Sequence, residues 1–140
     1  MRLVLKKVLI NLGVPQVLVR RVVDLDFDEV GKWVEVRGGS LPNRDLFPPT
    51  GFIVDGIACG FIYFTNSSVC ILDCYLSNPF TDKELRDEAL NLITTELIKY
   101  AKSHGCKLLK CDTKLDVIKK RALKHGFKPL GAYENFSMEL

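Results

Sequence analysis

The most regular hydrophobic pattern in the chain lies between residues 82 and 103. Apolar side chains recur there with a period near 3.6 residues, which predicts an amphipathic helix with one face on a core. Thr81 and Glu84 form the T-x-x-E pattern of a capping box at its start, and His104-Gly105 follows its end. This segment is therefore the strongest helix prediction in the sequence.

Two shorter helices are predicted on either side of it. The first covers about residues 27–37, where apolar positions again follow helical spacing and either Asp24 or Asp26 is placed to cap the first turn. The second is the basic segment 116–125, which Gly126 ends.

Seven segments have the character of β-strands, and two of them lie in the tail. Residues 17–23 are rich in valine, and two apolar runs flank Asp55-Gly56, a pair typical of a tight hairpin in which both central residues take positive φ. Residues 69–76 and 107–113 are predicted as further strands, and the tail 127–140 as two short ones. The strands are apolar on both faces, so we expect both faces of the sheet to be covered.

The order of these elements predicts an α/β fold. An antiparallel hairpin region is followed by strand, helix, strand, helix and strand, which indicates a mixed sheet with helices on both faces. The 140 residues suit a single domain spanning 1–140.

Composition narrows the function classes. Lys and Arg exceed Asp and Glu by only 20 to 17, so we expect no nucleic acid as partner. Five cysteines without a CxxC pair favour structural thiols in a reducing compartment over disulfides or a metal site, so we expect no metal. Cys70 and Cys74 fall on one face if their segment is a regular strand. No apolar run approaches the ~20 residues that span a bilayer, so we expect no membrane partner.

The N-terminal segment stands apart from this pattern. Residues 3–12 fit an amphipathic helix and a broken strand about equally well, and Lys6 and Lys7 interrupt the apolar run that a signal peptide needs. We interpret residues 1–14 as an extra arm of the mature protein. Its apolar side chains need a cover, which we expect to be the domain itself or a second copy in a homodimer.

The order and the residues together resemble the GNAT superfamily of N-acetyltransferases over residues 17–140. Three features carry the resemblance: the strand and loop ILDCYLSNP, the long helix directly after it, and LKHGF at 123–127. The resemblance implies a mixed sheet that splays in the middle and transfer of an acetyl group from acetyl-CoA to a primary amine. More weakly, PPTGF and the SNP loop resemble short phage-encoded members.

The resemblance also implies where acetyl-CoA binds. The family donates backbone N–H groups to the thioester oxygen at a bulge in the central strand, here near Cys74, Tyr75 and Leu76. Its pyrophosphate lies on an R-x-x-G-x-G/A turn, which aligns with RDEALN at 86–91 and so lacks both glycines. The residues implied on this basis are Lys83, Arg86, Asp87 and Ala89. Residues 82–88 carry four acidic and two basic side chains, and this net charge of −2 disfavours a phosphate.

Catalytic candidates follow from the same comparison. Asp73 interrupts an apolar strand and is the candidate base, because burial raises a carboxyl pKa; the alternative is that it pairs with a neighbour or faces a cleft. The family's proton-donating tyrosine aligns with Ala122 here. Tyr133 or Tyr75 are the candidate substitutes.

Two functions remain open from the sequence. The first is a small cytoplasmic N-acetyltransferase that uses acetyl-CoA and a small-molecule or protein amine as acceptor. The alternative is a catalytically inactive GNAT-fold protein that acts as a protein-binding module. An open, neutral or basic cleft at the end of the central strand favours the enzyme, and a plugged or acidic cleft favours the binding module.

Overall fold

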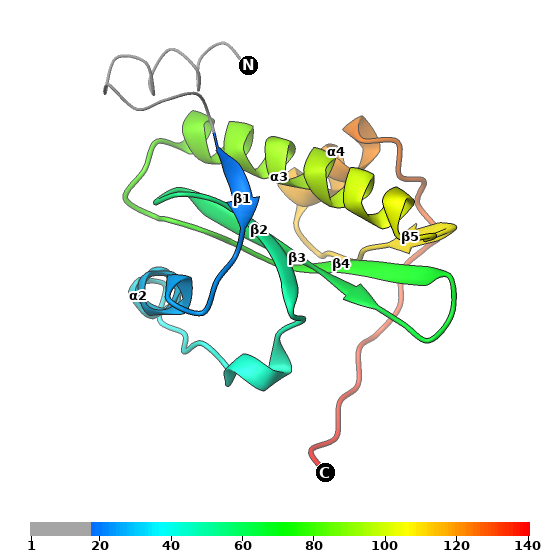
Figure 1. The fold of residues 1–140 in the computed structure, drawn as a ribbon, viewed down its shortest axis with the longest axis horizontal. Coiled ribbons are helices and arrows are strands. Elements are labelled where there is room, and N and C mark those ends of the chain that lie inside the picture. The colour runs from blue at the N-terminus through cyan, green and yellow to red at the C-terminus, as the bar shows by residue number, and fades with distance from the viewer. Residues whose placement is uncertain (1–17) are drawn as a thin grey trace.

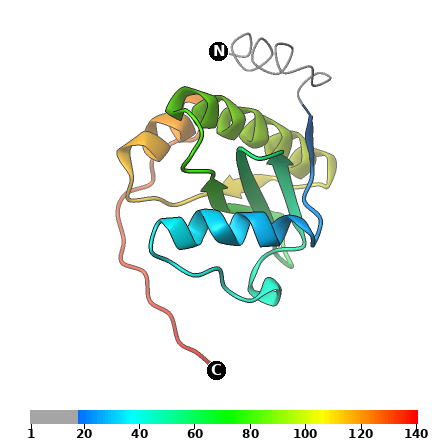
Figure 2. The ribbon, with the colours of Figure 1, turned by 90° about the vertical axis from the view of Figure 1, so that its left-hand side faces the viewer.

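The computed structural model describes residues 18–140, which form a five-stranded sheet with helices on both faces (Figures 1 and 2). The elements are β1 (Val19–Arg21), α2 (Asp26–Val36), the 3-10 helix η1 (Arg44–Leu46), β2 (Thr50–Val54), β3 (Ala58–Phe64), β4 (Val69–Ser77), α3 (Lys83–Ser103), β5 (Leu108–Lys110) and α4 (Asp116–Lys124). The predicted α/β class and the order of elements up to residue 126 are confirmed. The predictions for residues 3–12 and for the arm 1–14 lie outside the described residues.

The sheet has the strand order β1-β2-β3-β4-β5, antiparallel throughout except for the parallel pair β4–β5. The predicted hairpin at Asp55-Gly56 joins β2 to β3, but its turn differs from the prediction. Gly56 has a φ of 71°, whereas Asp55 has no positive φ. The Ile57 N–H donates to the Val54 carbonyl at 3.0 Å. Both observations fit a type II turn, which needs positive φ at only one position.

Each face of the sheet has its own hydrophobic core. Figure 2 shows α2 on one face and α3 with α4 on the other. On the α2 face, Trp33 and Val30 pack with Phe61 of β3. On the α3 face, Ile93 and Leu97 pack against the sheet, in a cluster that also contains Val54, Ala58, Ile62, Cys70, Leu72, Ala89 and Ala101. Two covered faces explain why the strands read as continuous apolar runs.

A β-bulge interrupts β4 and reverses its alternation. Phe61 pairs with Asp73 and Cys59 pairs with Leu76, so Cys74 and Tyr75 together oppose Gly60. Cys74 takes a φ of 57°, the one positive φ of a non-glycine residue in the described chain. The extra residue moves Cys74 to the α2 face, while Cys70 lies in the core on the α3 face. The prediction that these two cysteines share a face is therefore wrong.

The sheet splays between β4 and β5, as predicted. Pairing of the two strands ends at Ile71 and Lys110, whereas β4 continues to Ser77. Beyond Lys110 the chain turns away toward α4, so one side of β4 lacks a strand next to the bulge (Figure 1). This separation leaves a gap in the sheet beside residues 72–77.

Neither helix start follows the predicted capping. α3 begins at Lys83 with Asp82 as its N-cap, and the Thr81 hydroxyl donates to the Asn78 carbonyl at 2.7 Å. The loop thus uses the hydroxyl that a capping box requires, and the box does not form.

The start of α2 shows the same kind of departure. Leu25 is the N-cap residue and Asp26 is the first residue of the helix, so neither Asp24 nor Asp26 caps it with a side-chain hydrogen bond. The Asp26 carboxylate binds Arg20 at 2.7 Å and accepts the Val23 N–H at 2.8 Å.

The predicted strands in the tail do not form. Residues 127–140 contain no strand, and large apolar side chains such as Phe136, which is 90% exposed, lie on the surface. In Figure 1 the tail leaves α4 and extends past the sheet. A strand needs a neighbouring strand for its backbone hydrogen bonds, and the tail pairs with none here.

Candidate functional site

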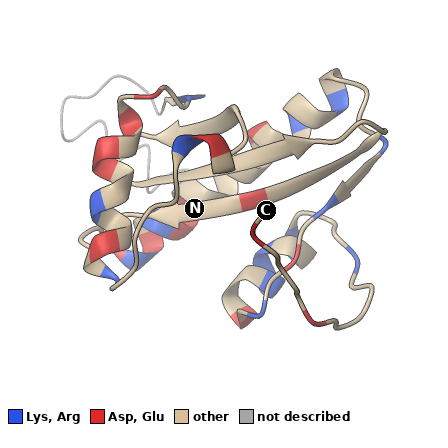
Figure 3. Cartoon of the chain, turned by 90° about the horizontal axis from the view of Figure 1, so that it is seen from below, with Lys and Arg blue, Asp and Glu red and all other residues tan. Residues whose placement is uncertain are grey.

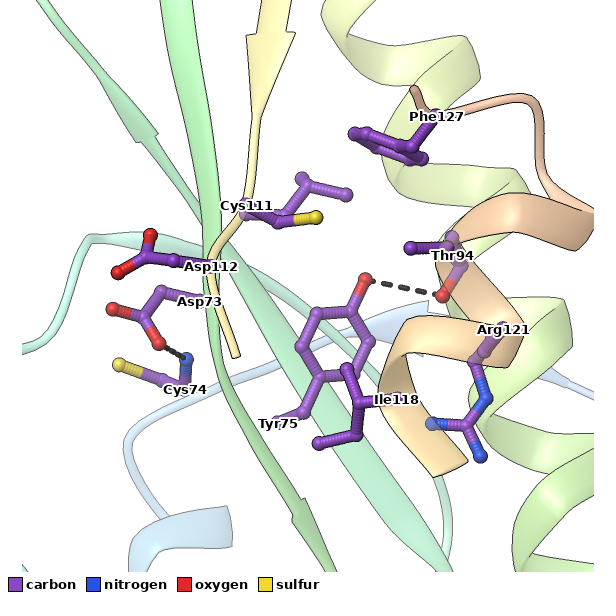
Figure 4. A pocket seen from close by; sticks show the side chains of 11 residues that line it. Asp73, Cys74, Tyr75, Thr94, Cys111, Asp112, Ile118, Arg121 and Phe127 are labelled. Carbon is purple, nitrogen blue, oxygen red and sulfur yellow. Dashed lines mark hydrogen bonds between the residues drawn. The ribbon is translucent and has the colours of Figure 1, made fainter. Parts of the chain in front are cut away.

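The gap beside β4 contains a cavity that continues into a larger groove. The cavity has a volume of about 190 Å³ and is lined by Leu72, Asp73, Cys74, Tyr75, Thr94, Cys111, Asp112, Ile118, Arg121, Ala122 and Phe127 (Figure 4). The groove measures about 1060 Å³ and runs from the end of β4 between the start of α3 and α4. Tyr75, Ile118 and Arg121 line both, so the two spaces adjoin.

The cavity joins the two faces of the sheet. Figure 4 shows Asp73, Cys74 and Asp112 on one side of β4, and Thr94 and Arg121 on the other. The bulge produces this division, because Cys74 and Tyr75 point to opposite faces. A molecule in the groove therefore reaches the same gap as a molecule that enters from the α2 face.

Tyr75 is held firmly at the centre of the cavity. Its hydroxyl lies 3.1 Å from the Thr94 hydroxyl, which donates its own proton to the Leu90 carbonyl at 2.8 Å. Tyr75 must therefore donate to Thr94. Burial raises the pKa of Tyr75 to about 12. Tyr75 is therefore a neutral side chain, and its hydroxyl proton is already engaged in the hydrogen bond to Thr94.

Asp73 lies at the cavity but is not buried. Its side chain is exposed, so the desolvation that we expected to activate it is absent. Asp73 Oδ1 accepts the Cys74 N–H at 2.7 Å. Of the three backbone donors predicted at Cys74, Tyr75 and Leu76, the first is therefore already bound by a side chain.

Tyr133 lies beside the same site although its strand does not form. A hydrogen bond with Asp112 is the main cause that raises the pKa of Tyr133, and Cys111 and Asp73 add to it. Asp112 and Cys111 were not predicted from the sequence, because nothing in KCDT distinguishes them from an ordinary strand end. Only the splay brings this strand end opposite Asp73.

The groove is basic, which corrects the prediction from residues 82–88. Its lining has six basic side chains and three acidic ones, a net of +3. The basic residues are Arg37, Lys83, Arg86, Lys120, Arg121 and Lys124, and the acidic ones are Glu84, Asp87 and Glu88. The local sequence is acidic, but α2 and α4 bring cations over the helix start from distant parts of the chain.

Two arginines meet at the end of β4. Arg37 donates to the Ser77 carbonyl and to its hydroxyl, and Arg86 donates to the carbonyls of Pro79 and Thr81. Burial and the nearby Arg86 charge lower the pKa of Arg37. Within residues 18–140 neither arginine makes an ion pair. Their positive charge is therefore available to an anion.

The segment that aligns with the glycine turn instead docks α4 on α3. Arg121 binds Asp87 at 2.7 Å, and His125 Nε2 lies 3.0 Å from Asn91 Oδ1. Ala89 is 0% exposed and belongs to the core, so the prediction that it contacts acetyl-CoA is wrong. Helical geometry turns position 89 toward the sheet. Of the four residues implied near the helix start, Lys83 and Arg86 line the groove and form no ion pair among residues 18–140. Asp87 also lines the groove, but it forms an ion pair with Arg121.

The described residues contain neither a metal-binding cluster nor a helix that could span a membrane. No group of three or more His, Cys, Asp or Glu side chains within residues 18–140 is arranged to hold a metal ion. All five cysteines, which lie in this part of the chain, are free thiols. Among the helices described, none combines the length and apolarity needed to cross a membrane.

The sequence matches no protein-family model and no curated protein. The fold does match solved structures. An acetyltransferase of Trypanosoma brucei superposes with a TM-score of 0.65 at 11% identity, over 88% of this chain and 100% of that one. AAC(6')-Iy, in complex with the bisubstrate analogue CoA-S-monomethyl-acetylneamine, gives 0.61 at 14% identity, over 90% and 100%. The aminoglycoside 6'-N-acetyltransferase AAC(6')-IG of Acinetobacter haemolyticus gives 0.53 at 15%, over 88% and 99%. The chain therefore has the fold of the GNAT acetyltransferases.

Proposed function

We propose that this protein is an N-acetyltransferase that moves an acetyl group from acetyl-CoA to a primary amine on a small molecule. The observation that carries the proposal is the gap in the sheet at the bulge. A basic groove reaches the gap from one face, and two carboxylates, Asp73 and Asp112, border it on the other. An anionic donor and a cationic acceptor suit these two sides.

The groove fits the anionic donor. Arg37 and Arg86 stand without carboxylate partners among the described residues, beside the start of α3. They offer guanidinium donors in place of the glycine-turn backbone, and guanidinium groups bind phosphate in a fork geometry. Acetyl-CoA supplies an acyl group already activated as a thioester.

The chain's own residues then provide orientation and proton removal. Tyr75 carries the remaining backbone N–H group of the predicted donor set, because the Leu76 backbone already forms a hydrogen bond with Cys59 across the β3–β4 pair. Asp73 and Asp112 are the candidate groups to receive the amine proton, either directly or through water. Their negative charge also favours an acceptor amine that arrives protonated. The fold neighbour solved with an aminoglycoside-type bisubstrate analogue supports a small-molecule acceptor.

An inactive binding module is the competing function. A binding module needs no gap in the sheet. The segment that aligns with the family's glycine turn also has a structural role here, because its Asp87 and Asn91 contact Arg121 and His125 of the α4 region. The groove is nevertheless open and basic, which is the condition that favours an enzyme.

Calorimetric titration with acetyl-CoA at low salt tests the proposal first. We expect binding, followed by release of free CoA thiol when a panel of amines is added. Polyamines and amino sugars carry several positive charges, so they should be acetylated faster than an amine with a single charge, such as benzylamine. No heat at millimolar acetyl-CoA contradicts the enzyme. Binding without thiol release across the panel favours the module.

A further inference from the structure

This chain has Ala122 at the position of the proton-donating tyrosine of the family it resembles. Ala122 lines the cavity and has no group that donates a proton or a hydrogen bond. Tyr75 does not replace it, because its hydroxyl proton is donated to Thr94 and its pKa is raised to about 12. Another group must meet negative charge that develops on a departing sulfur in this cavity.

Arg121, the residue before Ala122, has the required features. Its side chain is only 10% exposed, and it lines both the cavity and the groove. One end of the guanidinium, Nη2, is fixed by Asp87 Oδ1 at 2.7 Å. The Nε atom is buried and has no hydrogen-bond partner within residues 18–140. A buried N–H of a charged group without an acceptor is costly, which indicates that a ligand completes it.

The position of Arg121 relative to Tyr75 places this charge at the gap. Figure 4 shows Arg121 on the same side of β4 as Thr94, with Ile118 and the Tyr75 ring next to it. The Arg121 charge is close enough to lower the pKa of Tyr75, against the larger effect of burial. Asp87 restrains the guanidinium from α3, so it is oriented before a ligand binds.

We propose that Arg121 is a catalytic residue that stabilises the CoA thiolate as it departs. This inference rests on the proposed acetyltransferase function. The amine nitrogen forms a bond to the acyl carbon and the carbon–sulfur bond breaks, so the bonding electron pair leaves with sulfur. An amine that arrives protonated loses one proton before its nitrogen attacks and a second as the amide forms, and both protons pass to Asp73, Asp112 or water. Arginine keeps its own proton, so it acts by charge and hydrogen bonding, and the thiolate takes its proton from solvent.

The first test measures CoA itself, which carries the free thiol, bound to the full chain. The ultraviolet absorbance of the thiolate is followed against pH for the wild type, Arg121→Met, Arg121→Lys and Lys119→Gln. Lys119 lies on the same helix, is exposed and lines neither the cavity nor the groove, so its variant controls for loss of one charge. A cation at hydrogen-bond distance lowers the pKa of an acid by about 1–3 units.

We expect the bound thiol of the wild type and of Lys119→Gln to have a pKa about 1–3 units below that of free CoA. Arg121→Met should lose this shift, and Arg121→Lys should keep part of it. CoA that binds the wild type with an unshifted thiol pKa overturns the Arg121 proposal and leaves the acetyltransferase proposal standing. Failure of the wild type to bind CoA overturns both. Both of these contradicting results are measured on the wild type, so the proposal can be overturned even if a variant fails to fold.

The second test varies the leaving group. Arg121→Met should lower kcat roughly 10²-fold with acetyl-CoA, the size seen when one oxyanion donor is removed. The defect should shrink with an acetyl thioester of a more acidic thiol, because a stable thiolate needs less help. A defect that appears in KM alone, or that is equal for both thioesters, assigns Arg121 to binding or to structure and overturns the proposal.

Discussion

At the scale of the residue, the bulge in β4 sets the chemistry of the site. The αL conformation of Cys74 adds one residue opposite Gly60 and turns Tyr75 into the cavity. An αL backbone costs a non-glycine residue roughly 1–2 kcal/mol, so the surrounding ladder must hold it in place. Sequence alternation predicts Cys70 and Cys74 on one face, because a regular period of two residues does not reveal where a β-bulge inserts an extra one.

Gly60 is the residue that the bulge depends on most directly. A Cβ at this position would meet Cε1 of Tyr75 at 2.9 Å and Cγ2 of Ile93 at 3.1 Å. We expect Gly60→Ala to lower the free energy of unfolding by about 1–3 kcal/mol through overpacking, and to displace Tyr75. Chemical denaturation checks the stability, and a change in near-ultraviolet circular dichroism checks the ring.

Gly31 offers the matched control. It lies within α2, and a Cβ there meets only Leu41 Cδ2 at 3.9 Å, an ordinary contact. We expect Gly31→Ala to be neutral or to stabilise by up to about 1 kcal/mol, because alanine favours helices. Equal effects of the two substitutions contradict the steric account of Gly60.

The two carboxylates of the gap give a second prediction at this scale. Asp73→Asn keeps an oxygen that can accept the Cys74 N–H, so we expect folding to be intact. If Asp73 receives the amine proton, kcat should fall by roughly 10²-fold or more. Asp112→Asn, measured in parallel by steady-state kinetics with acetyl-CoA, identifies which carboxylate matters. Full turnover in both variants removes both from the mechanism.

At the scale of the element, helices were predicted more accurately than their ends or the tail. The apolar period of α3 is a local property and survives folding, whereas the capping box fails because Thr81 donates to Asn78 instead. The tail 127–140 was predicted as two short strands, but a strand exists only with a partner, and the sequence does not say whether one is present. The fold class followed from the order of elements, which needs no exact boundaries.

The docking of α4 on α3 predicts a pH dependence. Burial, with the charges of Lys124 and Arg121, lowers the pKa of His125, whose ring contacts Asn91. A lowered folded-state pKa means that the unfolded chain binds the proton first. The stability from neutral His125 is therefore present above about pH 6.5 and is lost as pH falls through the folded value.

The measurement is the unfolding midpoint in denaturant across pH 5–8 for the wild type and His125→Gln. Glutamine does not titrate and retains a side chain that can hydrogen-bond Asn91. We expect the wild type to lose more stability than the variant on acidification, with the difference confined to the acid side. Parallel curves for the two proteins would show that the docking contact does not depend on the charge of His125.

At the scale of the whole molecule, the prediction from local sequence is wrong for the charge around the start of α3. Figure 3 shows acidic and basic residues interspersed along much of the chain. The helix start at 82–88 is acidic by count, but the groove over it is basic, because Arg37 directly follows α2 and Lys120 and Lys124 come from α4. Asp112 was missed for the same reason, since only the splay places it opposite Asp73. Such pairings depend on tertiary proximity, which periodicity does not contain.

The N-terminal arm, residues 1–14, gives a prediction about assembly that rests on sequence alone. Its apolar side chains need a cover, and a second copy is one candidate. Sedimentation of the full chain and of a protein lacking residues 1–14 compares the two. A dimer that becomes a monomer on truncation supports assembly through the arm. An unchanged mass assigns the arm to its own domain or to another partner.

The net charge of the groove predicts how acetyl-CoA binding responds to salt. Six cations against three carboxylates leave +3, and the surface is exposed enough for ions to screen it. We expect the Kd measured by calorimetry to rise steadily between about 0.01 and 0.5 M salt, over which the Debye length falls from roughly 30 Å to a few ångströms. Arg37→Gln and Arg86→Ala should each weaken binding and flatten this dependence, because each removes a guanidinium that has no carboxylate partner in residues 18–140. Lys102→Gln, which removes an exposed charge at the far end of α3 and outside the groove, should leave both unchanged. If acetyl-CoA binds with the same affinity in the two arginine variants, the ligand lies elsewhere than at the end of β4. If Lys102→Gln weakens binding as much as they do, the attraction comes from overall charge and not from a built anion site.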